Sequence, residues 1–236
     1  MEKTALVVGG TSGIGLATAR LLLARGATVH VVGRDKERLD ALAESGLIGH
    51  RADGGNREEI AAVAEGIGRI DALIVTLSGS EGVGAFADLD LGMLRRAFEA
   101  KFWAHLTTIQ AVLPWLAEAG SITLLSAITA RTGMPGTAGI AALNGAVEAL
   151  AKPLAVELAP IRVNAVSPGV VDTPWWAGLP ADARDAYFAQ VERALPARHI
   201  ATAEEVAELV AVAATNPNIT GTVFETDGGA RLVSIG

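Results

Sequence analysis

The sequence predicts an α/β fold: a doubly wound parallel sheet of about seven strands, covered by helices on both faces in a three-layer sandwich. The first observation is that short runs rich in Val, Ile, Leu and Thr recur along the chain with helical runs between them. The second is that these runs lack the alternation of a half-exposed sheet, which is typical of parallel strands buried on both faces. The expected strands are residues 4–8, 28–33, 47–53, 71–77, 121–126, 161–167 and 221–226.

Helical stretches separate these strands, for example residues 15–26 and 91–120. Such an order favours parallel strands joined by right-handed crossovers. There is no internal repeat, low-complexity segment or linker, and a chain of 236 residues is long enough for one substantial core. We therefore expect residues 1–236 to form a single domain.

The composition excludes several classes of function. A net charge of −7 argues against nucleic acid as a partner, because phosphate binding needs a basic face. The absence of cysteine excludes disulfides, thiolate nucleophiles and Cys-ligated metals, and no metal site is expected. No apolar run reaches the length of about 18 residues that spans a bilayer, and the first strand leaves no room for a signal peptide. We expect no membrane partner and a cytoplasmic location.

The first expected strand leads directly into a glycine-rich turn, VVGGTSGIGLATAR. Glycine is needed there because the backbone must turn sharply and a Cβ would block a pyrophosphate, which the N-terminus of the following helix attracts. The position between strand and helix predicts a Rossmann-type NAD(P)-binding domain, the alternative being a turn that binds nothing. The residues expected at the cofactor are Gly9, Thr11, Ser12, Gly13, Ile14 and Gly15.

The end of the second strand indicates which dinucleotide is bound. An acidic residue there would hold a ribose 2′-hydroxyl, whereas this chain has Arg34, whose guanidinium can pair with a 2′-phosphate. Ser12 could donate a further hydrogen bond. We therefore expect NADP rather than NAD, the alternative being that Arg34 only begins a solvated helix. Asp53, after the third strand, is expected at the adenine.

With these motifs in order, the chain resembles the short-chain dehydrogenase/reductase family over essentially its whole length. The similar segments are the GIG of the glycine loop, the AD after the third strand, IRVNAVSPGVVDTP (161–174) and TAEEVAELV to ITGTVFETDGG (202–229). The resemblance implies a segment at the nicotinamide end of the cofactor, made of Asn164, Pro168, Gly169, Val171 and Thr173. The TDGG motif resembles a subunit-interface strand of the family, so a homo-oligomer, tetramer or dimer, is implied.

The catalytic positions of the family hold Asn, Ser, Tyr and Lys in that chain order, and all four differ here. Lys101 stands at the asparagine position, Ala127 at the serine, Ile140 at the tyrosine and Asn144 at the lysine. The family's NNAG-like segment is replaced by VTLSGS (75–80). The resemblance therefore identifies a divergent member that lacks the family's catalytic residues.

These replacements remove the usual proton donor. Carbonyl reduction needs a hydride and then a proton on the developing alkoxide, which Ile140 cannot supply. Losing such a group costs about 10²–10⁴-fold in rate. By the resemblance, Lys101 and Asn144 look like an exchange of the family's asparagine and lysine between facing helices. Asn144 is expected at the cofactor, and if both side chains reach the nicotinamide ribose, an ammonium is still present.

Lys101 and His105 are four residues apart and therefore share one helix face. They are candidates for an acid–base pair or for a site that binds an anionic substrate. The alternative is that Lys101 pairs with Glu99 or Glu148 and that His105 is a packed histidine.

Three aromatic residues lie in the segment that covers the substrate in the family: Trp175, Trp176 and Tyr187. The tryptophans either line an apolar substrate site or anchor the cover or a subunit contact. Tyr187, the only tyrosine, either moves its phenol over the cofactor or packs in the cover.

Two hypotheses of function follow. In the first, the protein is an NADP(H)-binding oxidoreductase with a rewritten catalytic site, acting on a small apolar carbonyl or related compound. Lys101 would supply charge, and water or His105 the proton. In the second, it is a non-catalytic member of the family that binds cofactor or serves as a partner subunit, in a hetero-oligomer with an active relative. Fold alone does not choose between them.

Overall fold

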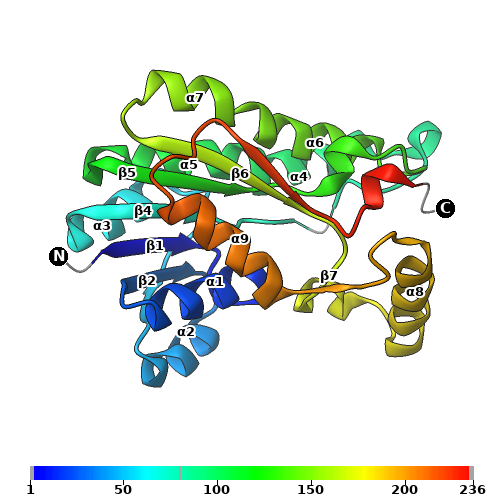
Figure 1. Ribbon diagram of the computed structural model, residues 1–236, viewed down its shortest axis with the longest axis horizontal. Coiled ribbons are helices and arrows are strands. Elements are labelled where there is room, and N and C mark those ends of the chain that lie inside the picture. The colour runs from blue at the N-terminus through cyan, green and yellow to red at the C-terminus, as the bar shows by residue number, and fades with distance from the viewer. Residues whose placement is uncertain (1–2, 80, 234–236) are drawn as a thin grey trace.

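In the computed structural model, which describes residues 3–79 and 81–233, seven parallel strands form one sheet with helices on both faces (Figure 1). The order of the strands across the sheet is β3-β2-β1-β4-β5-β6-β9. The predicted doubly wound parallel sheet is therefore confirmed. Its strands are β1 (Thr4–Val8), β2 (Thr28–Gly33), β3 (Ile48–Arg51), β4 (Ile70–Val75), β5 (Leu116–Leu125), β6 (Arg162–Pro168) and β9 (Val223–Thr226).

The helices cover the sheet in two groups, and each group closes its own hydrophobic core. Successive side chains of a strand point to opposite faces, so Val7 packs with α1, α2 and α9, while Leu6 packs with α3, α5, α6 and α7. The helices are α1 (Gly13–Ala24), α2 (Lys36–Leu42), α3 (Arg57–Ile67), α4 (Leu91–Phe98), α5 (Ala104–Val112), α6 (Ala138–Ala149), α7 (Ala151–Glu157), α8 (Ala181–Ala194) and α9 (Ala203–Thr215).

The strand order reverses beside β1, which has β2 on one side and β4 on the other. In open parallel sheets, ligands bind in the crevice at the carboxyl ends of the strands at such a switch point. Figure 1 shows α8 and the chain before it projecting beyond this same edge of the sheet. The topology therefore places the glycine loop, the end of β2 and the segment after β6 around one crevice.

The long helical stretch expected at 91–120 is divided in the structure. A π-turn (Glu99–Trp103) separates α4 from α5, which ends at Val112, and β5 already begins at Leu116. A 3₁₀ turn (Leu113–Trp115) follows α5, and Pro114 within it has no N–H group to donate to a continuing helix. A short pair of strands, β7 (Val171–Asp172) and β8 (Ala201–Thr202), was not expected either.

One helical segment of the described chain, Ala138–Glu157, is long and apolar enough to pass as a membrane span by length and composition. It comprises α6 and α7, and its Val147 and Ala151 are fully buried in the core that also contains Ile122 of β5 and Val163 of β6. These contacts are those of a core helix packed on the sheet.

Candidate active site

A cavity of about 1060 Å³ lies at the carboxyl ends of the strands. Its wall is built from the loop after β1 and from the segments that follow β2, β4, β5 and β6. All the residues predicted at the cofactor except Asn164 contribute to this wall: Gly9, Thr11, Ser12, Gly13, Ile14, Gly15, Arg34, Asp53, Asn144, Pro168, Gly169, Val171 and Thr173. Asn164 does not line it, because its buried side chain binds the backbone of Ala213, Ile219 and Thr222.

The glycine loop has the shape that its sequence requires. Gly9 and Gly13 have φ angles of +88° and +51°, a region that favours glycine. A Cβ on Gly15 would lie 2.5 Å from both the Gly9 carbonyl oxygen and Thr76 Oγ1. Ser12, the N-cap of α1, makes no capping bond with its side chain, and the first turn has no acidic residue. The loop and helix terminus therefore fit the phosphates of a dinucleotide.

The side chain of Arg34 is 80% exposed at the cavity, and its Nη1 lies 3.9 Å from Asp53 Oδ2. At that distance and exposure the pair is weak, which leaves the guanidinium available to a ligand. Arg38 also lines the cavity and contacts Asp35, its Nε lying 3.3 Å from Oδ2. Sequence reasoning missed Arg38, which lies in α2, four residues after Arg34.

Lys101 projects from the π-turn and is only 5% exposed, yet it contributes to the cavity wall. Turns of this kind occur frequently at functional sites. Lys101 Nζ donates to Asn144 Oδ1 at 2.7 Å and to the Ser126 carbonyl oxygen at 3.3 Å. Burial lowers the pKa of Lys101 to about 8, an effect that the charge of Glu148 partly opposes. The structure therefore brings Lys101 and Asn144 together.

The other contacts of Asn144 fix the orientation of its amide. Nδ2 donates to Thr129 Oγ1 at 2.9 Å and to the Ile140 carbonyl oxygen at 3.0 Å, so Oδ1 is left to accept from the ammonium. Ala127 and Ile140 stand where the family has its serine and tyrosine. Both line the same cavity. Neither can donate a proton.

His105 lies elsewhere. It is fully buried in α5, does not contribute to the cavity wall, and its Nδ1 lies 2.7 Å from the Lys101 carbonyl oxygen. Burial, followed by the charge of Lys101, lowers the pKa of His105 to about 3. The ring is therefore neutral at physiological pH, and the structure does not bring the Lys101 and His105 side chains together at the cavity.

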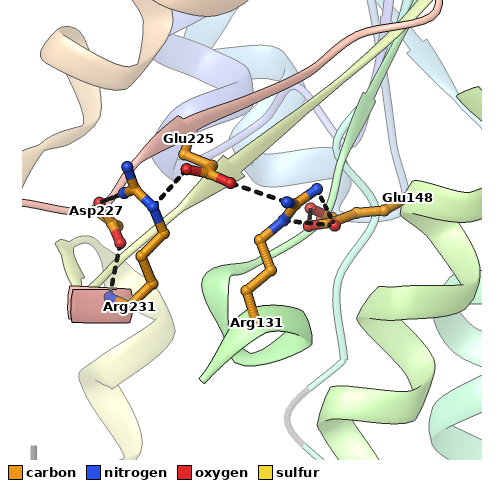
Figure 2. A network of polar contacts seen from close by, with 6 residues as sticks. Arg131, Glu148, Glu225, Asp227 and Arg231 are labelled. Carbon is orange, nitrogen blue, oxygen red and sulfur yellow. Dashed lines mark hydrogen bonds and ion pairs between the residues drawn. The ribbon is translucent and has the colours of Figure 1, made fainter. Parts of the chain in front are cut away.

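A chain of ion pairs links Glu148 of α6 to Arg131, Glu225 and Arg231 (Figure 2). Glu148, one of the partners considered for Lys101, instead accepts from Ser126 Oγ at 2.8 Å and pairs with Arg131 at 2.9 Å. Arg131 also pairs with Glu225 at 2.9 Å, and Glu225 pairs with Arg231 at 2.6 Å. The residues of this chain come from segments far apart in the sequence, so no local pattern predicts their contacts. The only sequence signal for any of them was that Glu148 follows Asn144 by four residues.

The aromatic cover closes one side of the cavity. Trp175, Trp176 and Tyr187 all line it, and the ring of Trp176 packs between the other two, with centroids 4.6 Å and 5.2 Å away. Trp175 Nε1 donates to the Gly79 carbonyl oxygen at 3.2 Å, which joins the segment after β6 to the segment after β4. Ser80, the last residue of the VTLSGS segment, lies outside the described residues.

Known proteins are similar over nearly the whole chain. A family model described as "Enoyl-(Acyl carrier protein) reductase" matches residues 8–231. Cis-4-hydroxycyclohexanecarboxylate dehydrogenase of Sinomonas cyclohexanicum is 35% identical over 98% of both chains. The 3-oxoacyl-[acyl-carrier-protein] reductase FabG of Thermotoga maritima is 33% identical, over 96% of this chain and 97% of the relative.

A solved small-chain dehydrogenase in complex with NADPH shares the fold, with a TM-score of 0.87 and 37% identity. The match covers 98% of this chain and 100% of that one. The fold, the crevice and the relatives together indicate an oxidoreductase with an α/β fold. The chain belongs to the short-chain dehydrogenase/reductase family.

Proposed function

We propose that this protein is an NADP(H)-dependent oxidoreductase with a rewritten proton-transfer site, acting on a small apolar carbonyl compound or the corresponding alcohol. The observation that carries the proposal is the 2.7 Å hydrogen bond between Lys101 Nζ and Asn144 Oδ1, inside the cavity that the glycine loop and Arg34 also line. It keeps an ammonium and an amide together where the family has the same two groups in exchanged positions. The named relatives, a dehydrogenase and a reductase, support redox chemistry.

The residues on the cofactor side of the cavity support NADP(H) as the cofactor. The glycine loop and the N-terminus of α1 would hold the pyrophosphate, and Arg34 with Arg38 the 2′-phosphate. The segment from Pro168 to Thr173 would hold the nicotinamide end. When bound, the nicotinamide supplies or accepts the hydride.

The chain's own contribution to the chemistry is charge and a proton. The Lys101 ammonium lies in a water-poor site and can stabilise negative charge that develops on a substrate oxygen. Because its pKa is lowered to about 8, it can also give up a proton near neutral pH. Asn144 orients the ammonium, and the aromatic cover of Trp175 and Trp176 excludes water. His105, neutral and packed, has no part in this proposal.

Titration calorimetry with NADPH and NADH tests the cofactor assignment. We expect wild type to bind NADPH more tightly than NADH. Arg34→Ala should weaken NADPH binding by about tenfold or more, since it removes a charge-assisted contact, and leave NADH nearly unchanged. Arg20→Ala, an exposed arginine of α1 away from the cavity wall, is the matched control and should bind both nucleotides as wild type does.

Two results would count against the proposal. Absence of binding to either nucleotide would mean that the glycine loop is retained as scaffold only. Tight NADPH binding without oxidation of NADPH by a broad panel of ketones, quinones and imines would favour the non-catalytic alternative, a cofactor-binding partner subunit.

A further inference from the structure

We propose that Lys101 is an anion-binding subsite within the substrate cavity, and that the substrate carries an anionic oxygen, a carboxylate or an enolate, beside its reacting carbonyl group. The inference rests on the proposed function for the place of the substrate. Its test does not depend on turnover.

The ammonium of Lys101 has more N–H groups than hydrogen-bond acceptors within the described chain. Lys101 Nζ carries three N–H groups, and its two acceptors, Asn144 Oδ1 and the Ser126 carbonyl oxygen, are both uncharged. Among residues 3–79 and 81–233, no carboxylate lies within ion-pair distance of Nζ. One N–H of a buried cation that lines the cavity is therefore available for an acceptor that the ligand brings.

Two titratable groups around Lys101 are either paired with other residues or neutral. Glu148 is the carboxylate that acts on Lys101 electrostatically, but it is already paired with Arg131 and accepts from Ser126. His105, packed beneath Lys101, is neutral because its pKa is lowered to about 3. These groups leave the positive charge of Lys101 without a counter-ion of its own.

Two charged residues of the neighbouring helical turns also reach the cavity wall. Arg96 is engaged by Glu81, with 2.9 Å between Nη2 and Oε1. Glu99 is exposed, so water screens its attraction for the ammonium. Neither changes the sign of the potential at Lys101.

The absence of a counter-ion for Lys101 among the described residues has an energetic cost. A buried charge with only neutral partners is costly, and the lowered pKa of Lys101 reflects that cost. An anionic oxygen placed at the free N–H provides a counter-ion in a site shielded from water, where charge-assisted hydrogen bonds are strongest. A neutral ligand of the same shape gains much less, so the site selects anions.

The remaining wall near Lys101 defines the rest of the ligand. The cavity that Lys101 lines has many apolar side chains in its wall, among them Ala127, Ile128, Met134, Ile140, Leu143 and Trp176, together with the hydroxyl groups of Thr129 and Tyr187. An apolar ring or short chain that bears a 2-oxo acid or an enolised 1,3-dicarbonyl fits this combination. In both groups the anionic oxygen adjoins the carbonyl oxygen, so one ammonium can contact both.

Calorimetry with cyclohexanecarboxylate and its neutral isostere cyclohexanecarboxamide tests the subsite, with NADPH-saturated and nucleotide-free protein. At pH ~6.5 wild type should bind the carboxylate about tenfold or more tightly than the amide. Above pH 8 this preference should fall, because Lys101 loses its proton, while the affinity for the amide stays constant.

Variants assign the effect to Lys101. Lys101→Met should abolish the preference for the carboxylate. Asn144→Asp, nearly isosteric, places a carboxylate against the ammonium and should abolish it as well, which keeps the test valid if Lys101→Met does not fold. Lys152→Met, an exposed lysine of α7, is the matched control and should keep the preference.

The outcomes separate the two proposals. Equal binding of both probes, failure of the carboxylate to bind, or a preference that survives in the Lys101→Met and Asn144→Asp variants would overturn the subsite, whether or not NADPH binds. A Lys101-dependent preference in a protein that binds no nucleotide would leave the subsite standing and remove the proposed function.

Discussion

Lys101 and Glu148 are both buried charges, and their partners differ in kind. Lys101 has two neutral acceptors, whereas Glu148 has the Arg131 guanidinium and the Ser126 hydroxyl. A buried carboxylate with a cation and a hydroxyl is compensated within the fold. A buried ammonium without a carboxylate is compensated only from outside. At the scale of single residues, Glu148 therefore contributes to stability, whereas the role that we propose for Lys101 is in ligand binding.

Glu148→Gln should therefore destabilise the protein. The variant keeps the shape of the side chain but weakens its contacts with Arg131, and we expect a loss of about 1.5–3 kcal/mol in the free energy of unfolding. Urea denaturation measures it. The control is Glu81→Gln, which breaks the more exposed pair with Arg96 and should cost about 0–1 kcal/mol. Equal losses in the two variants would contradict the distinction between them.

At the scale of elements, the same residue type has opposite roles in two helices. Gly15, in the first turn of α1, lies against the carbonyl oxygen of Gly9, so that no side chain fits without moving the loop. Gly145, in the middle of α6, has open space where a Cβ would be. The first glycine shapes the phosphate loop, and the second only weakens its helix.

Alanine at each position should separate these roles. Gly15→Ala should lower the affinity for NADPH by about tenfold or more, because the loop must shift away from the new Cβ. Gly145→Ala should leave this affinity unchanged and raise the free energy of unfolding by about 0.5–1 kcal/mol. Calorimetry and urea denaturation of both variants give the answer. Normal NADPH affinity in Gly15→Ala would contradict the role of the loop.

At the scale of the whole molecule, stability depends on pH through histidines on the face of the sheet that α3 and α5 cover. His105 has a folded-state pKa of about 3 against an ordinary value of 6.5. Below pH 6.5 the unfolded chain therefore binds a proton that the folded protein does not, and stability falls as the pH is lowered. His30 and His50, paired across β2 and β3, have pKa values lowered first by burial and act in the same direction.

Between pH ~7 and ~5 the free energy of unfolding should therefore decrease, by at most about 1.4 kcal/mol per pH unit for His105. His105→Phe should show a smaller decrease over the same interval, whatever its stability at the upper pH. Urea denaturation at several pH values measures both slopes. If the free energy of unfolding decreases equally with pH in wild type and variant, His105 is not responsible for the pH dependence.

Much of the fold could be predicted, because buried parallel strands and the glycine turn are local patterns. The VVGG motif marks the end of β1 and the loop after it, and the predicted cofactor residues other than Asn164 line one cavity. The end of α5 was missed because Pro114 lies within an otherwise apolar helical run. A homo-oligomer, inferred from TDGG, stays a prediction that light scattering in solution would test.

The candidate catalytic residues show where sequence spacing fails. Four-residue spacing grouped Lys101 with His105, but the structure turns one toward the cavity and packs the other. By sequence, Glu148 is a candidate partner of Lys101. In the structure Glu148 pairs instead with Arg131, which comes from a different segment. Contacts between distant segments depend on packing, which a local pattern does not record.

The Lys101–Asn144 contact also restricts which side chains can replace either partner. Changing Asn144 to lysine would place two buried ammonium groups at hydrogen-bonding distance, where they repel each other. Changing Lys101 to asparagine would place two amides there, and two amides can bond to each other. The protein should therefore tolerate asparagine at both positions better than lysine at both positions.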